Sequence, residues 1–316
     1  MKIATAFAIL ATSATAHPVE ERAEENKAEI YAHNVLHKLE MLSWDKSQPP
    51  KYETGKDWQY TCAPILMGNL FGSSADQVQF WEKNSILTDR PVKTEAFYLS
   101  VVDATSVHTG SEGTGSVETA QSTTNTKTET KGWNIGAKVT GNFGKKDVAA
   151  GVVELSGQYS ESTTLTNTET TTVTFKGPCP PAHECRIETW TFHLNIDATV
   201  SRELGYQVWS ISNGMLGERP LCLMEEKFRI CDQFTSRYDA NCAKDGSFGL
   251  LEPTKNVHLT VPIREANGIQ AMSRLVLVQE PLSLKKARDE SVPANMGTKE
   301  TIQKAIEQGT KFEFLN

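Results

Sequence analysis

A long middle stretch of this chain, residues 92–177, contains neither proline nor cysteine, although the whole chain has 13 prolines and 6 cysteines. Proline is excluded from paired strands because it cannot donate to a strand ladder. Two tracts in the stretch, Ser122–Lys131 and Thr164–Phe175, are dense in hydroxyl side chains and alternate threonine with other polar residues. Threonine is β-branched and favours the pleated backbone. The stretch therefore predicts long paired strands and a mainly β chain.

Between these tracts, residues 133–159 have the pattern of an amphipathic hairpin with its turn at residues 144–148. If Phe143 lies opposite Ala149, one face is apolar and the other is polar except close to the turn. A slip of one residue would scramble both faces. The apolar face covers about eleven residues per strand, which matches the 9–11 residues of a tilted transmembrane β-strand. The expected lipid face consists of Trp133, Ile135, Ala137, Val139, Phe143, Val153, Leu155 and Tyr159.

The polar face of this hairpin places Lys138 directly opposite Glu154, and we expect both to face the lumen of a barrel. Opposite charges across a ladder stabilise that register by roughly 0.2–1 kcal/mol. A single hairpin cannot enter a membrane alone, because its unpaired edge groups would each cost several kcal/mol in hydrocarbon. Several copies would have to share one closed barrel. The same alternation also fits a two-faced surface hairpin that never leaves the protein.

The first 16 residues predict a secretory signal peptide. Lys2 supplies a positive start, residues 3–11 are apolar, and Ala14 and Ala16 form a small-residue cleavage site. The apolar run is too short to span a bilayer. We therefore expect a secreted protein whose mature chain begins near His17.

In a secreted chain, an even number of cysteines indicates disulfides, here three. Cys179 and Cys185 enclose a short, proline-stiffened loop and are expected to pair with each other. Cys62 is then expected to pair with one of Cys222, Cys231 and Cys242, and the sequence does not decide which.

The rest of the chain divides by composition. Residues 17–50 are acidic at first and then carry apolar residues at helical spacing, which fits a helical prosegment and a structural helix equally. We expect residues 51–91 and 205–253 to form a cysteine-containing head. An elongated β module is expected from residues 92–204 and 254–285, and a C-terminal tail from residues 286–316.

The order of these features resembles the aerolysin-like β-pore-forming toxins, in the branch of the epsilon-toxin and the mosquitocidal toxins. The resemblance implies an elongated aerolysin-like fold, a head that binds a receptor, a ring-shaped homo-oligomer and a barrel with one hairpin per protomer. The chain departs from the family in its cysteine-rich segment and in lacking a recognisable lectin module, which leaves the receptor open. The features that carry the resemblance are the tract 119–130, the hairpin 133–159, the tract 160–174, the proline-containing turn 176–181 and the strand 186–196 with alternating aromatics.

Members of this family are often activated by proteolysis. The resemblance therefore suggests an activation site at Lys285, Lys286 and Arg288, whose cleavage would remove the C-terminal tail as a propeptide. A basic turn before a packed helix fits the same residues.

Other function classes find little support in the sequence. The net charge of −7 argues against nucleic acid, which needs a basic surface. His33 and His37 stand four apart but lack the glutamate of a zinc-protease helix, and no nucleophile elbow occurs. We therefore expect no enzyme, no metal and no cofactor.

Taken together, the patterns and the resemblance predict a secreted, toxin-like protein that oligomerises on target cell membranes and inserts a hairpin from each protomer. Its expected partners are the target membrane and an unidentified surface receptor. The alternative is a non-lytic, lectin-like binding or effector protein on the same scaffold. Its candidate ligand contacts would be Trp58, Trp81, Trp190 and Trp209.

Overall fold

The computed structural model describes residues 34–55, 57–61, 77–140, 151–159, 165–210, 214–215, 217–224, 226–229, 231–244, 249–284 and 296–315. Several predicted features lie outside these ranges. They are the signal peptide, the hairpin turn at 144–148, Phe143, Cys62, His33 and the basic cluster of Lys285, Lys286 and Arg288, together with the side chain of Tyr159.

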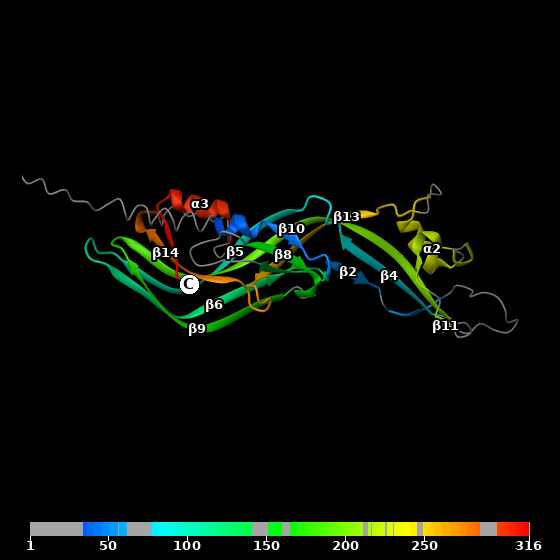
Figure 1. The fold of residues 1–316 in the computed structure, drawn as a ribbon, viewed down its shortest axis with the longest axis horizontal. Coiled ribbons are helices and arrows are strands. Elements are labelled where there is room, and N and C mark those ends of the chain that lie inside the picture. Colours follow the sequence, from blue (N-terminus) through cyan, green and yellow to red (C-terminus); the bar gives the residue numbers. More distant parts are fainter. Residues whose placement is uncertain are drawn as a thin grey trace, which may run out of the picture.

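The described chain is elongated and mainly β (Figure 1). Its longest strand, β10 (His183–Ser210), has 28 residues. At roughly 3.3 Å per residue, that strand extends over about 90 Å. The predicted mainly β fold with long antiparallel strands is confirmed. The other long strands are β4 (Gln77–Ile86), β5 (Lys93–His108), β6 (Gly115–Thr128), β9 (Leu165–Cys179), β13 (Thr254–Arg264) and β14 (Ser273–Pro281).

The shorter elements flank these strands. The short strands are β1 (Leu42–Trp44), β2 (Lys51–Thr54), β3 (Gln59–Tyr60), β7 (Gly136–Thr140), β8 (Val152–Ser156), β11 (Gly214–Met215), β12 (Arg219–Pro220), β15 (Met296–Gly297) and β16 (Lys311–Phe314). The helices are residues 34–39, α2 (Asp232–Asn241) and α3 (Lys299–Glu307), with 3-10 turns at Gly157–Tyr159, Leu221–Leu223, Glu226–Phe228 and Leu282–Leu284. None of the helices in the described part of the chain is long and apolar enough to cross a membrane.

β10 is the spine of the main sheet because four long strands pair along its two edges. On one edge it pairs antiparallel with β5 and then with β4. On the other edge it pairs with β14 and then with β13. Residues near Val200 pair with both β4 and β13, so the two ends of the molecule share one continuous strand.

The central part of β10 alternates between two environments. Trp190, Phe192 and Leu194 are buried in the largest apolar cluster, where Trp190 stacks on Tyr98 with ring centroids 3.8 Å apart. The residues between them, including His193, are polar and equally buried on the opposite face. Successive side chains of a strand point to opposite faces. β10 is therefore buried on both faces in its centre.

A second, two-stranded sheet covers the polar face of β10. It consists of β6 and β9, the two hydroxyl-rich tracts, paired antiparallel from Gly115 opposite Cys179 to Thr128 opposite Leu165. We call this unit the β6–β9 ribbon. In Figure 1 it runs along the lower side of the molecule, below β5 and β14. The predicted strand conformation of both tracts is thereby confirmed.

The far end of β10 carries the cysteine-containing segment (Figure 1). There Phe234 of α2 packs edge-on against Phe80 and Tyr206, with ring centroids 5.0 and 5.5 Å away, in a cluster of its own. A disulfide joins Cys222 to Cys242 across α2. Cys231 is disulfide-bonded as well.

Cys179 and Cys185 form the disulfide that their spacing predicts. It joins the end of β9 to the start of β10, within an apolar cluster that includes Val117, Ile187 and Leu277. The bond therefore fastens one end of the β6–β9 ribbon to the main sheet.

Replacing Cys179 and Cys185 by serine is expected to lower the free energy of unfolding by roughly 2 kcal/mol, because the unfolded chain regains the entropy of a short loop. The matched variant replaces Cys222 and Cys242, whose separation is 20 residues rather than 6. Its longer loop predicts a larger loss of roughly 3 kcal/mol. Guanidinium unfolding measures both. An unchanged midpoint for the first variant would show that this bond does not fasten the ribbon.

Candidate functional site

The predicted amphipathic hairpin is present as β7 and β8, paired antiparallel. Ala137 lies opposite Leu155, and Val139 opposite Val153, as the predicted register requires. The expected charge pair is also formed: the Lys138 ammonium lies 3.1 Å from a carboxylate oxygen of Glu154. Both charged side chains are partly exposed, so this pair contributes little stability beyond fixing the register.

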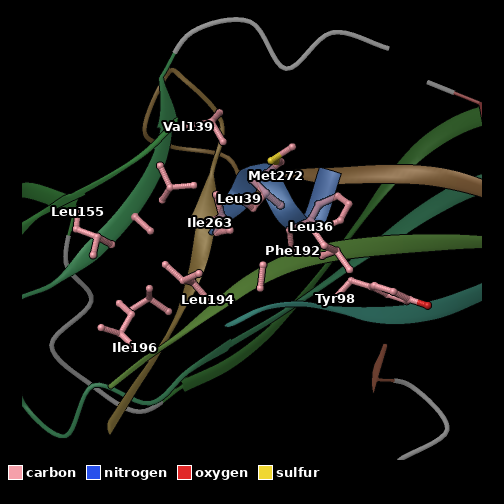
Figure 2. Close-up of a cluster of buried hydrophobic side chains, with 14 of the residues drawn as sticks. Leu36, Leu39, Tyr98, Val139, Leu155, Phe192, Leu194, Ile196, Ile263 and Met272 are labelled. Carbon is pink, nitrogen blue, oxygen red and sulfur yellow. The ribbon is translucent and has the colours of Figure 1, made fainter. Parts of the chain in front are cut away.

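The apolar face of this hairpin points into the protein. The side chains expected to face lipid are at most 3 % exposed and belong to the largest core cluster. They lie against the helix at residues 34–39 and against β10 and β13 (Figure 2). In this structure the face is therefore hidden from water. The described members of that face are Trp133, Ile135, Ala137, Val139, Val153 and Leu155.

Both edges of the hairpin are paired in the described residues. β13 runs parallel to β7, with Ile263 opposite Ala137. On the other side β1 runs parallel to β8, with Leu42 opposite Val153 and Trp44 opposite Leu155. The backbone groups that would be unpaired in an isolated hairpin thus have partners.

The outer partner of the hairpin belongs to one continuous segment, residues 34–51, which we call the strap. Its helical part covers the apolar face with Val35, Leu36 and Leu39, which are all buried. Its extended part then follows β8 and crosses to the start of β7. The backbone hydrogen bonds are Val153 N–H to Met41 O at 2.8 Å, Asp45 N–H to Leu155 O at 2.9 Å, Gly157 N–H to Gln48 O at 2.7 Å and Asn134 N–H to Lys51 O at 2.8 Å.

The strap also explains why the strands are shorter than expected. The pattern predicts strands that begin at Trp133 and end at Tyr159, whereas β7 begins at Gly136 and β8 ends at Ser156. The Asn134 N–H, which would point across the hairpin in the predicted register, donates to the strap instead, and a 3-10 turn begins at Gly157. Trp133 is buried and stacks on Tyr52, with ring centroids 5.8 Å apart. Trp133, which the pattern places on the lipid face, therefore lies in the protein core in this conformation.

Side chains fasten the strap at two further points. The Ser156 hydroxyl donates to Asp45 at 2.9 Å. Hydrogen bonds from Ser47 and then from Ser156 lower the pKa of Asp45 below its usual value. At the other end, Glu40 accepts a hydrogen bond from Lys299 of α3 at 2.8 Å. The C-terminal tail thus contacts the same strap that holds the hairpin.

The described part of the tail is packed into the protein. Ile302 of α3 is buried in the main cluster, and β16 pairs with β14. Phe312 and Phe314 meet Trp190 edge-on, with ring centroids 5.5 and 5.8 Å away. These contacts fit a packed helix after a basic turn, and cleavage of the tail remains a prediction.

Sequence patterns indicated the hairpin but not the strap. The helical spacing of Val35, Leu36 and Leu39 predicts an apolar helix face. Leu42 and Trp44 alternate with other residues as in a short strand. These signals were present, but they do not say which surface the segment covers. Among the tryptophans considered as ligand contacts, Trp190 is buried, whereas Trp58, Trp81 and Trp209 are partly exposed.

Comparison with known proteins does not identify a family for this chain. No protein-family model matches this sequence, and no curated protein matches it. Two similar solved structures are the parasporin-2 toxin of Bacillus thuringiensis, described as recognising cancer cells, and a chain of the Cry23Aa1–Cry37Aa1 binary protein complex. The identities are 12 % and 13 %, over 64 % and 72 % of this chain and 75 % and 94 % of those chains. Both TM-scores are 0.20, too low for either match to decide the fold or the function.

Truncation of Leu36 to alanine is expected to loosen the strap and the hairpin together, at a cost of roughly 2–5 kcal/mol, because a fully buried side chain leaves a cavity. Hydrogen exchange of the β7 and β8 amides should accelerate with that of residues 36–44. The control is Met41→Ala, since Met41 lies on the same segment but is 42 % exposed. Equal effects of the two variants would contradict a specific role for the helical part of the strap.

Proposed function

We propose that this protein is a secreted, pore-forming, toxin-like protein. It docks on a target membrane through an unidentified surface receptor, assembles with further copies of itself, and contributes residues 133–159 to a shared transmembrane β-barrel. Val139 and Leu155 then face lipid, and Lys138 and Glu154 face the aqueous lumen. The function needs no catalytic residue and no cofactor.

The observation that supports this proposal most is how the hairpin is held. The described part of its apolar face is hidden, and the covering helix and the outer strand belong to the strap, whose strand β1 pairs with β8 and not with β10. The two described disulfides join Cys179 to Cys185 and Cys222 to Cys242, and neither ties the hairpin to the strap.

Transfer of the hairpin into lipid exchanges one apolar environment for another. The face of Ile135, Val139 and Leu155 leaves the protein core and meets hydrocarbon, so little hydrophobic free energy is lost. The edge groups are the obstacle, because each one left unpaired in hydrocarbon costs several kcal/mol. In a closed ring of copies, the neighbouring hairpins replace β1 and β13 as edge partners. Homo-oligomerisation is thus a physical requirement of the proposed insertion.

The contact between Lys299 and Glu40 suggests how proteolysis would act. A cut at Lys285, Lys286 or Arg288 would break the covalent link between β14 and the tail. Loss of the tail would then remove Lys299 from the strap, and β16 from the edge of β14. Activation of this kind would free both the hairpin and a strand edge for assembly.

Locking the hairpin to the strap is the sharpest test of insertion. Ser43 and Glu154 lie opposite each other on β1 and β8, and both are partly exposed. Neighbouring strand residues lie within the Cα separation that a disulfide spans. We expect the double variant Ser43→Cys, Glu154→Cys to release no dye from plasma-membrane vesicles while oxidised. Mild reduction should restore the release.

The single variants Ser43→Cys and Glu154→Cys are the matched controls, and each should release dye under both conditions. Wild type with the same reductant controls for the native disulfides. Direct charging of Val139 or Leu155 is a weaker test, because both are buried and an arginine there would disturb the folded protein before it reached a membrane. Unimpaired leakage from the oxidised double variant would contradict insertion of this hairpin.

A second candidate is a non-lytic binding protein on the same scaffold, and one row of residues favours it. Tyr60, Gln77, Trp209 and Met215 lie opposite one another on β3, β4, β10 and β11. Tyr60 is 74 % exposed and Met215 is 63 % exposed. Aromatic residues and methionine are enriched at binding interfaces. Electron microscopy separates the two functions, because only the pore-former should produce rings on membranes.

A further inference from the structure

The β6–β9 ribbon is attached to the main sheet in an unusual way. Every second N–H group of β6 points away from β9 and toward β10. Three of these groups are bound by side chains of β10 instead of by a backbone ladder: Thr123 N–H donates to Thr189 Oγ1 at 3.2 Å, Asn125 N–H to Thr191 Oγ1 at 3.1 Å and Lys127 N–H to His193 Nε2 at 2.9 Å.

The next group in the series returns to backbone pairing. Glu129 N–H donates to Thr260 O at 2.8 Å, and Thr260 N–H donates back to Glu129 O at 3.1 Å. The donors on β6 and the acceptors on β10 stay in step because, in both strands, every second residue faces the same side. We call each of the three bonds from a β6 N–H to a β10 side chain a rung. Thr189, Thr191 and His193 are fully buried, so each rung is shielded from water.

The partners of His193 determine its protonation state. Its Nδ1 lies 2.9 Å from the backbone oxygen of Thr191, which can only accept, so Nδ1 carries the proton. Its Nε2 faces the Lys127 N–H, which can only donate, so Nε2 must be the bare acceptor. The rung therefore requires a neutral imidazole. A second proton on Nε2 would set two donors against each other in a buried site.

The surroundings of His193 oppose that second proton. Burial is the main reason why the pKa of His193 falls from 6.5 to about 4. The hydrogen bond to Thr191 O opposes this shift, and the positive charge of Lys127 on β6 adds to it. From β5, the ring of Phe97 stacks on the imidazole at a centroid distance of 5.1 Å. From β13, Pro262 lies opposite it. No carboxylate among the described residues forms a hydrogen bond or an ion pair with the imidazole.

The sign of the pH effect follows from these values. A detached ribbon exposes His193, whose pKa then returns toward its ordinary value near 6.5. The detached state binds more protons than the docked state between the two values, so docking weakens as the pH falls from about 6.5 to about 4. Above that window docking is at full strength, and below it no further change is expected from His193.

One other titratable group faces the rungs. Asp103 of β5 accepts a hydrogen bond from the Thr189 hydroxyl, and burial raises the pKa of Asp103. A raised carboxyl pKa has the opposite effect on docking: it makes docking stronger as the pH falls, because the docked state then holds the proton more readily. Its ordinary value is 3.8, so this opposing effect lies above pH 3.8, inside the His193 window, and reduces the pH response that His193 alone would give.

A disulfide fastens the ribbon to the main sheet at one of its two ends. The disulfide of Cys179 and Cys185 joins it to β10 at its outer end, where Val117 and Leu277 pack around the bond. The other end of β6 continues into the hairpin strand β7. Loss of the three side-chain bonds would leave the outer end in place as a hinge. At the hairpin end, the backbone pair of Glu129 and Thr260 and the pairing with β13 and the strap must also open before the hairpin moves.

We propose that Thr189, Thr191 and His193 form a proton-sensitive latch on the β6–β9 ribbon. Uptake of a proton by His193 releases residues 123–127 of the ribbon from the main sheet. Once the Glu129–Thr260 pair and the strap also open, the ribbon carries the hairpin outward about its disulfide-bonded end. As a control on membrane insertion, the latch rests on the pore-forming function proposed above. The release of the ribbon itself does not.

Hydrogen exchange of the full-length protein at a series of pH values tests the latch. After correction for intrinsic exchange, peptides covering residues 120–128 should open about 30-fold more between pH 7.5 and pH 5, from the two pKa values of His193. Peptides of β14 should stay protected. In His193→Gln, whose amide oxygen can accept from Lys127 N–H without titrating, this pH dependence should disappear.

The matched control is His258→Gln, because His258 is an exposed histidine on β13 that pairs with Asp197 at 2.7 Å. It should behave like wild type. Wild-type exchange at residues 120–128 that does not change from pH 7.5 to pH 5 would overturn the latch, even if His193→Gln fails to fold. An equal pH response in His193→Gln would overturn it as well.

Dye release from plasma-membrane vesicles at the two pH values separates the latch from the pore. Acid-dependent opening of the ribbon with faster leakage at pH 5 supports both proposals. Acid-dependent opening without leakage at either pH supports the latch and contradicts the pore-forming function. Leakage that is equal at both pH values, despite opening of the ribbon, would overturn the latch as a control on insertion.

Discussion

The edge of a β-strand carries donors and acceptors that must find partners wherever water is excluded, and this requirement shapes the whole molecule. β10 meets it with long strands on both sides. The hairpin meets it with β13 on one side and the strap on the other. β6 meets it in a third way, with hydroxyl and imidazole side chains of β10 in place of a neighbouring backbone.

These three solutions differ in how easily they can be reversed. Continuous pairing along β10 is extensive and joins the two ends of the molecule through one strand. The strap and the side-chain rungs are local, and each holds an element that belongs to the same chain segment, from β6 through the hairpin to β9. The structure thus combines an extensively paired frame with a segment that is held by local contacts. If the hairpin enters lipid as proposed, that division would keep the edges paired in both environments.

Much of the hairpin could be predicted from the sequence, because a period of two and one charge pair leave few registers open. Lys138 and Glu154 meet as the pattern requires, and Ala137, Val139 and Leu155 share one face. The strand ends were wrong because the Asn134 N–H donates to a segment far earlier in the chain and a 3-10 turn begins at Gly157. Nothing local to residues 133–159 encodes that competition.

The sequence by itself determined the strand-rich class, the amphipathic hairpin with its register and the Cys179–Cys185 bond, because periodicity and short spacing are local properties. Only the tertiary structure decided what each face meets. The polar positions Thr189, Thr191 and His193 look like a strand face toward water, yet they are buried against the backbone of β6. A polar residue can form its hydrogen bonds with water or with another strand, and the sequence is the same in both cases. Only long-range contacts distinguish the two.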